Sequence, residues 1–165
     1  MKHIFETRLT IDETAGPIPG FEVVAEAGCH YRGYKINGPE SAQRLCTDAL
    51  VPYFVNKRDQ EEMHVIALDT KHKPLKIVRV TRGTLDASLV HPREIFRPAL
   101  WCSASAVLLV HNHPSGETKP SKEDIHVTER MERAGETVGI SVLDHIILTH
   151  EDSLSIKAYQ HIGGR

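Results

Sequence analysis

The chain has 165 residues, a length that suits one domain built around a single hydrophobic core. Its hydrophobic fraction of 40% and charged fraction of 25% are those of an ordinary soluble globular protein. The formal net charge of -2 argues against a dedicated duplex-DNA binder, which usually carries a strong positive field, although it leaves room for a local basic patch.

Cysteine usage and hydropathy indicate a cytoplasmic protein. Cys29, Cys46 and Cys102 are odd in number, far apart and without a CxxC pair, which argues against a disulfide framework and favours small buried hydrophobic residues. No apolar run approaches the length of about 20 residues that crosses a bilayer. The polar N-terminus lacks the apolar core of a signal peptide. We therefore expect a reducing compartment and no membrane partner.

Residues 1–37 are interpreted as an N-terminal extension of short strands. Weak alternation on either side of a Gly- and Pro-rich loop predicts strands near 5–11 and 21–26, and residues 31–36 are a candidate third strand. An exposed strand in this region can pair between subunits, so a homo-oligomer is one expected assembly.

Residues 38–165 are predicted to form the main domain. Pro39 stands at the first position of a helix, and apolar residues recur at helical spacing as far as Phe54. After a polar break, two strands are predicted at 63–68 and 75–80. The turn-forming residues between these strands indicate a hairpin.

Helices and strands alternate in the rest of the domain. The predicted elements are a helix over 91–102, a buried strand over 104–110, a helix over 121–138, a strand over 140–148 and a short strand over 153–158. Gly139 closes the second of these helices, and Trp101 is expected in the core or at an interface. The order indicates an α/β or α+β domain, in which a mixed β-sheet is flanked by helices.

Two histidines follow the buried strand at a spacing that suits metal binding. Side chains at i and i+2 of a strand lie on one face, so His111 and His113 can converge on one ion. Asp124 lies in the first turn of the next helix, and the loop over 114–120 can fold that turn back to complete a His/His/Asp set. Three such ligands leave a fourth position for water, as in catalytic zinc sites, and this water supplies hydroxide near neutral pH.

A hydrolytic site also needs a base and an oxyanion stabiliser. Ser121, three residues before Asp124, can direct its hydroxyl towards a substrate carbonyl. The base must come from elsewhere. Glu61 and Glu62, at the start of a predicted strand, are candidates, and spacing alone does not exclude Glu94.

Helix capping explains part of the same pattern without a metal. Ser121 and Asp124 form a capping box, with the serine as N-cap and the aspartate at N3. A reach of the Asp124 carboxylate back to the N-cap amide competes with metal ligation, so spacing by itself leaves both interpretations open.

The full spacing is that of a known motif. His-x-His, seven residues, Ser, two residues and Asp match the JAMM motif of JAB/MPN domains without a gap, from His111 to Asp124. The string over 113–116 and the stretches 83–85, 90–96 and 143–147 resemble the RadC-like branch of these domains. The resemblance covers roughly residues 38 to 158.

This resemblance implies a fold and a set of roles. The fold is a curved mixed β-sheet between helices, the JAB/MPN (cytidine deaminase-like) architecture, with zinc at one edge of the sheet. His111, His113 and Asp124 would ligate Zn²⁺, and Ser121 would hydrogen-bond the tetrahedral intermediate. Apart from the resemblance, Asp144 and His145 lie in a predicted strand near the presumed site, where we expect a buried pair that supports the site or the core, rather than direct ligands.

The same resemblance implies a general base from the first core strand. Alignment of that strand places the glutamate at Glu61, but a slip of one residue in the register exchanges it with Glu62. Longer RadC-like proteins also carry a helix-hairpin-helix module associated with DNA binding. Residues 1–37 are too short for that module, so we expect a short form and a weakened DNA role.

The function expected from these observations is that of a zinc metallopeptidase or isopeptidase, which hydrolyses an amide bond in a protein or peptide through a zinc-bound water. The alternative is an accessory protein of DNA repair or recombination that acts on or binds nucleic acid, and it depends on family association alone. A phosphodiesterase with the same zinc water would differ only in its substrate.

Overall fold

The computed structural model describes residues 18–26, 31, 33–54, 60–83 and 90–163. Its strands are β1 (Glu22–Glu26), β2 (Glu62–Leu68), β3 (Pro74–Arg82), β4 (Ala106–Asn112), β5 (Ser141–Leu148) and β6 (Ser153–Ser155). Its helices are α1 (Pro39–Phe54), α2 (Pro92–Trp101), α3 (Lys122–Val138) and α4 (Ile156–Ile162). The described part of the chain therefore has the mixed α/β content that the sequence predicts.

The strands form one mixed sheet in the order β1-β3-β2-β4-β5-β6. β4 and β5 are parallel, and the other neighbouring pairs are antiparallel. A parallel pair needs a crossover, which α3 supplies between β4 and β5. Every residue of β2 and β4 is buried, as their central place requires.

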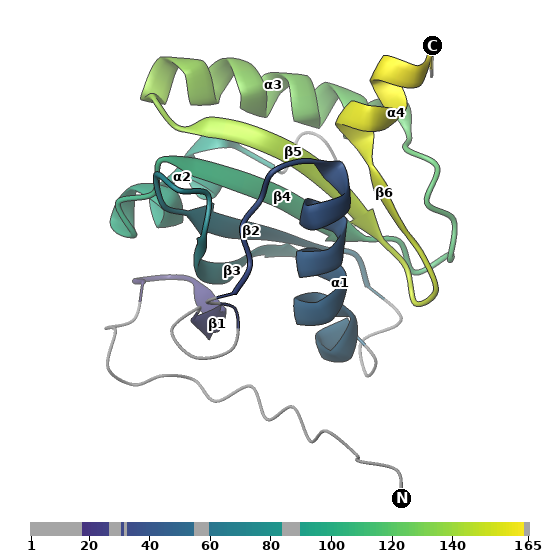
Figure 1. Cartoon of the computed structure of the whole chain (residues 1–165), viewed down its shortest axis with the longest axis horizontal. Helices are drawn as coiled ribbons and strands as arrows, with labels where there is room; N and C mark the ends of the chain where they lie inside the picture. The colour runs from purple at the N-terminus through teal and green to yellow at the C-terminus, as the bar shows by residue number, and fades with distance from the viewer. Residues whose placement is uncertain (1–17, 27–30, 32, 55–59, 84–89, 164–165) are drawn as a thin grey trace, which may run out of the picture.

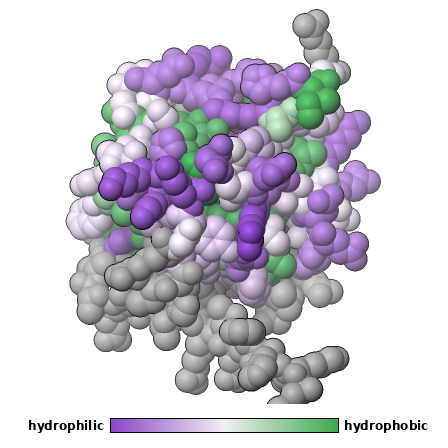
Figure 2. All heavy atoms as spheres, in the orientation of Figure 1, coloured by the Kyte–Doolittle hydropathy of each residue, from purple (hydrophilic) through white to green (hydrophobic). Residues whose placement is uncertain are grey.

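Helices cover both faces of the sheet (Figure 1). One core lies between the sheet and α1, which crosses in front of the strands in Figure 1, and it contains Leu45, Ile66 and Leu108. The second core lies under α2 and α3 and contains Leu109 and Met131. Hydrophilic side chains gather along the top of the molecule, over α3 (Figure 2), because this helix buries only its inner stripe.

Most of the predicted elements are confirmed. Pro39 is the first residue of α1, Ser121 is the N-cap of α3, and Gly139 caps the end of α3 in the left-handed conformation. The strand predicted near 21–26 is β1, which pairs with β3, so the N-terminal extension contributes a strand to the sheet. The strand predicted near 5–11 lies outside the described residues.

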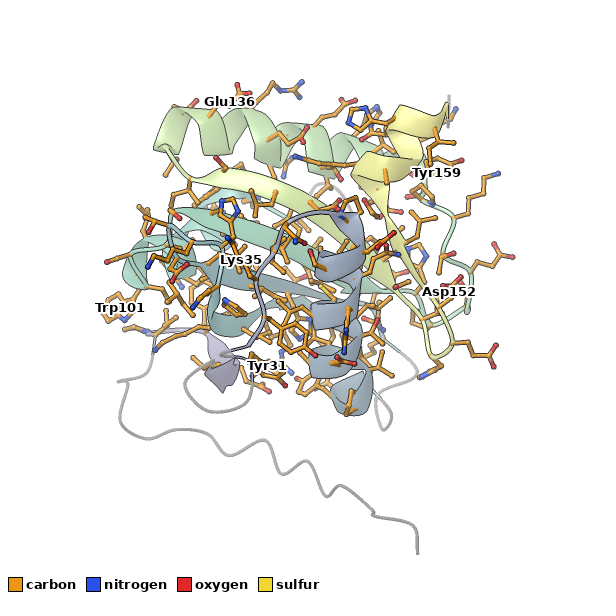
Figure 3. All side chains as sticks on the ribbon, in the orientation of Figure 1. Tyr31, Lys35, Trp101, Glu136, Asp152 and Tyr159 are labelled. Atoms are coloured by element: carbon orange, nitrogen blue, oxygen red, sulfur yellow. The ribbon has the colours of Figure 1, made fainter. Side chains whose placement is uncertain are left out.

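Two expectations are wrong. The described residues of 31–36 form no strand; Tyr34 N donates to Tyr31 O in a turn instead. The strand expected over 153–158 ends at Ser155. Ser155 is the N-cap of α4, and its hydroxyl accepts a hydrogen bond from Ala158 N. Of the two places expected for Trp101, the core is excluded, since 58% of the residue is exposed at the end of α2 (Figure 3), and a place at an interface stays a prediction.

No helix in the described part of the chain is both long and apolar enough to span a membrane. Cys46 is a free thiol, and it is buried as expected. Cys29 lies outside the described residues.

Candidate metal centre

The two histidines meet at the end of β4. His111 lies on the strand, which runs two residues further than predicted, and its ring is fully buried. His113 follows the strand, and its backbone N–H donates to Leu148 O on β5 at 2.8 Å. The Nε2 atoms of the two histidines are 2.9 Å apart, so the predicted convergence is confirmed.

Asp124 joins the histidines from the first turn of α3. Its Oδ1 lies 3.2 Å from His111 Nε2, and its Oδ2 lies 3.6 Å from His113 Nε2. The three residues offer ligand atoms that all lie within 4.8 Å of one another, an arrangement that could hold a metal ion. Two imidazoles and a carboxylate are a donor set that zinc accepts, with one position left for water.

The capping box is also present, and it shares the carboxylate with the metal centre. Ser121 Oγ accepts from Asp124 N at 3.1 Å, while Asp124 Oδ2 accepts from Ser121 N at 2.7 Å and from Ser121 Oγ at 2.6 Å. Oδ1 remains directed at His111. Capping therefore does not use the whole carboxylate, because Oδ2 accepts the capping bonds while Oδ1 stays available to a metal ion.

The charges in the centre shift two pKa values in opposite directions. Burial raises the pKa of Asp124, but the hydrogen bonds that the protonated rings of His111 and His113 donate to it, together with the hydrogen bond from Ser121, outweigh burial and hold the pKa far below its usual range. Burial lowers the pKa of His113, but Asp124, the Glu117 carbonyl and the charge of Glu61 outweigh it, so the pKa is raised. The negative charge of Asp124 thus favours a cation in this centre, either a proton on His113 or a metal ion.

The tautomer of His113 suits metal binding. Its Nδ1 lies 2.7 Å from the carbonyl oxygen of Glu117. Because a carbonyl only accepts, the proton of the neutral ring is on Nδ1, and Nε2 presents a lone pair to His111 and Asp124. The donor chemistry of the centre therefore fits a bound cation.

The two candidate glutamates on the first core strand lie in different surroundings. Glu62 is fully buried, and its carboxylate lies 3.5 Å from Arg79 Nη1 and 3.4 Å from Arg82 Nε. The charge of Glu61 instead contributes to the raised pKa of His113. Glu94 lies in the first turn of α2, where it pairs with Arg93 at 3.2 Å.

Asn112, between the two histidines, was missed by the sequence analysis. Its Oδ1 accepts from Glu62 N at 2.7 Å, and its Nδ2 donates to Gln60 O at 3.0 Å. These bonds hold the backbone on both sides of Glu61. The alternation of side chains along β4 was the available signal, because it places Asn112 on the face of the sheet opposite to that of the two histidines.

Thr128 was also missed, and His145 has a more specific place than expected. His145 Nε2 lies 2.8 Å from His111 Nδ1, and His145 Nδ1 lies 2.7 Å from Thr128 Oγ1. Burial lowers the pKa of His145 well below its usual value, with the charge of His111 as a further cause. Asp144 faces α4 instead and accepts from Ser155 Oγ at 2.7 Å. Spacing offered one signal, because Thr128 is one helical turn after Asp124.

Asn112→Ala is expected to destabilise the fold by about 1–3 kcal/mol, because it leaves the buried N–H of Glu62 without an acceptor. Chemical denaturation of the zinc-free protein measures the change. Asn37→Ala, which removes an exposed asparagine, is the control and should leave the free energy of unfolding nearly unchanged. Equal stabilities of the two variants would contradict the role of Asn112 in holding the backbone around Glu61, an arrangement that we call the Asn112 clamp.

Comparison with known proteins identifies similar chains. A family profile described as RadC-like JAB domain matches residues 36–161. A UPF0758 protein of Alkaliphilus oremlandii is 43% identical over 129 residues, which are 78% of this chain and 53% of that protein. A UPF0758 protein of Methanosarcina barkeri is 43% identical over 122 residues, 72% of this chain and 53% of that protein. A UPF0758 protein of Geobacter sulfurreducens is 47% identical over 96 residues, 58% of this chain and 42% of that protein. The chain thus spans about half the length of these curated relatives.

Proposed function

The chain belongs to the RadC-like JAB domain family, and on this premise we propose that it is a zinc-dependent JAMM-type metallopeptidase or isopeptidase that hydrolyses an amide bond. The observation that carries the proposal is the convergence of His111, His113 and Asp124 from two elements, with ligand atoms within 4.8 Å of one another. The substrate we propose is a protein or peptide, met in the cytoplasm.

The three converging residues would hold the ion. His111 and His113 offer their Nε2 atoms, and Asp124 offers Oδ1 while Oδ2 caps α3. When bound, zinc would supply a Lewis acid and lower the pKa of a water molecule to near neutrality. Imidazole nitrogen with carboxylate oxygen favours zinc over the hard cations Mg²⁺ and Ca²⁺, which prefer oxygen ligands.

Glu61 is the proposed general base. Its carboxylate accepts a proton from the attacking water and later gives it to the leaving amine. Two observations support Glu61 over Glu62: its charge acts on His113, and the Glu62 carboxylate is engaged with Arg79 and Arg82. The clamp by Asn112 would fix the backbone that carries this base.

Ser121 is the proposed stabiliser of the oxyanion. In the structure its hydroxyl donates to Asp124 Oδ2 at 2.6 Å. Ser121 is exposed, so rotation of the hydroxyl about its side-chain bond would turn this donor towards a substrate carbonyl oxygen. Asp124 Oδ2 would keep the backbone N–H of Ser121 as its capping partner.

Metal analysis and substrate screening test the proposal together. Purified protein is expected to carry about one zinc ion per chain and to cleave members of a peptide and isopeptide library. Full cleavage activity in Asp124→Ala would rule the proposal out. DNA affinity that falls with salt and survives removal of both histidines, without any cleavage, would instead favour the nucleic-acid accessory alternative.

Zinc binding is expected to stabilise the fold more at about pH 8 than at about pH 6. In the zinc-free protein the pKa of His113 is raised above 6.5, so its proton stabilises the fold below that pH, and this contribution is lost as pH rises through the folded pKa. Zinc needs the same nitrogen without a proton. Near pH 8, zinc at about 100 times its Kd should add about 2.7 kcal/mol.

Thermal unfolding with and without zinc, across this pH range, measures the difference. His113→Ala is the matched variant, because it removes the titrating ring and should leave little stabilisation by zinc at either pH. A zinc effect that grows as pH falls would contradict the proposed ligand set.

A further inference from the structure

A chain of hydrogen bonds joins two of the proposed ligands behind the metal centre. Thr128 Oγ1 donates to the carbonyl oxygen of Asp124 at 2.7 Å. Thr128 Oγ1 also lies 2.7 Å from His145 Nδ1, and His145 Nε2 lies 2.8 Å from His111 Nδ1. Thr128, His145 and His111 are all fully buried, so water does not compete for these bonds.

The chemistry of the groups fixes the direction of every proton in this chain. A carbonyl only accepts, so the single hydroxyl proton of Thr128 is committed to Asp124 O. His145 Nδ1 must then donate to Thr128 Oγ1, which leaves His145 Nε2 as an acceptor. His111 Nδ1 must therefore donate to His145, and the Nε2 of the neutral His111 ring carries a lone pair.

A β-bulge aims His145 at the centre. In the pairing of β5 with β4, Val107 lies opposite Val142 and Leu108 lies opposite Asp144, so Leu143 is an extra residue. Val142 and Ile146 would share a face of an unbroken strand, but they pack in opposite cores. The extra residue therefore turns His145 towards His111, a use of bulges that recurs beside active sites.

We propose that Thr128 and His145 are positioning residues that hold His111 in the tautomer with its proton on Nδ1, so that the bare Nε2 faces the bound metal before the metal arrives. The inference rests on the proposed metal site but concerns residues that do not touch the ion. It makes the Asp124 carbonyl, one turn of α3 and the β5 bulge parts of the same ligand-orienting device. Loss of such outer partners typically lowers metal affinity by about 10–100-fold.

The test compares Thr128→Val with Thr128→Ser. Valine keeps the shape of threonine and removes the hydroxyl, whereas serine keeps the hydroxyl. Thr137→Val is the matched control, because the Thr137 hydroxyl donates to the carbonyl of Arg133 at 3.1 Å, the same bond to residue i−4 without a histidine beyond it. His145→Phe, which keeps a ring and removes both nitrogens, is a second probe of the chain.

Two readouts are measured on each folded variant. Long-range ¹⁵N–¹H spectra of the histidine rings in the zinc-free protein report which nitrogen of His111 carries the proton. Competition with a chromogenic chelator gives the Kd for zinc. We expect Thr128→Val to mix the His111 tautomers and weaken zinc binding by about 10–100-fold, while Thr128→Ser and Thr137→Val resemble the wild type; His145→Phe should lose at least as much affinity as Thr128→Val.

The outcomes separate this inference from the proposed function. If the wild type binds zinc, the inference is overturned when Thr128→Val keeps the wild-type tautomer of His111 or binds zinc as tightly as the wild type. Either result leaves the metal site standing. A wild type that binds no zinc overturns the proposed function, and the tautomer spectra of the zinc-free proteins then decide whether the chain of hydrogen bonds orients His111. A loss of affinity shared by Thr128→Ser would assign the effect to packing and also contradict the inference.

Discussion

Asp124→Asn is expected to reduce bound zinc from about one ion per chain to background and to abolish hydrolysis. The substitution removes the only carboxylate of the proposed ligand set and the negative charge that offsets the cation. The amide oxygen of asparagine can still accept from Ser121 N, so the start of α3 is preserved. Elemental analysis after gel filtration measures the zinc content, and circular dichroism checks the fold.

Glu123→Gln is the matched control for this prediction. Glu123 is an exposed carboxylate in the same first turn of α3, so its removal tests whether a negative charge at the helix start suffices. This variant should keep its zinc. Retention of near-stoichiometric zinc by Asp124→Asn would remove the basis of the proposed centre.

Glu61→Gln is expected to lower kcat by about 10²–10⁴-fold while zinc binding is retained, because a neutral amide cannot take a proton from the attacking water. Steady-state rates on a substrate found by the library screen measure the effect, and the chelator assay verifies that the metal site is intact. Since the residue is only partly buried, the free energy of unfolding should change little.

Glu62→Gln supplies the opposite pattern. Its carboxylate is fully buried beside Arg79 and Arg82, so the neutral variant should lose about 1–3 kcal/mol of stability, a value reduced from that of a fully buried pair because Arg82 is half exposed. Its kcat per folded molecule should stay near that of the wild type. If instead Glu62→Gln lost the catalytic rate and Glu61→Gln did not, the assignment of the base would be wrong by one register step.

Local patterns in the sequence were sufficient for most helices and strands. The apolar spacing after Pro39, the Ser121 cap and Gly139 are signals between residues at most a few positions apart, and each corresponds to an observed boundary. The same range of interaction makes His111 and His113 converge, because side chains two apart share a face of an extended chain, and His113 directly follows the end of β4. α4 was missed because a seven-residue helix has too few apolar positions to display a period.

What the sequence by itself determined about this protein is its family, its elements and the His-x-His pair with Asp124 one loop away. Only the tertiary structure decided how the Asp124 oxygens divide between cap and centre, which surroundings Glu61 and Glu62 enter, and how the extra residue Leu143 turns His145 towards His111. The reason is that helical and strand periods couple near neighbours, whereas register and bulges couple residues that are tens of positions apart in the chain. Those couplings depend on the packed sheet as a whole, and no short pattern records them.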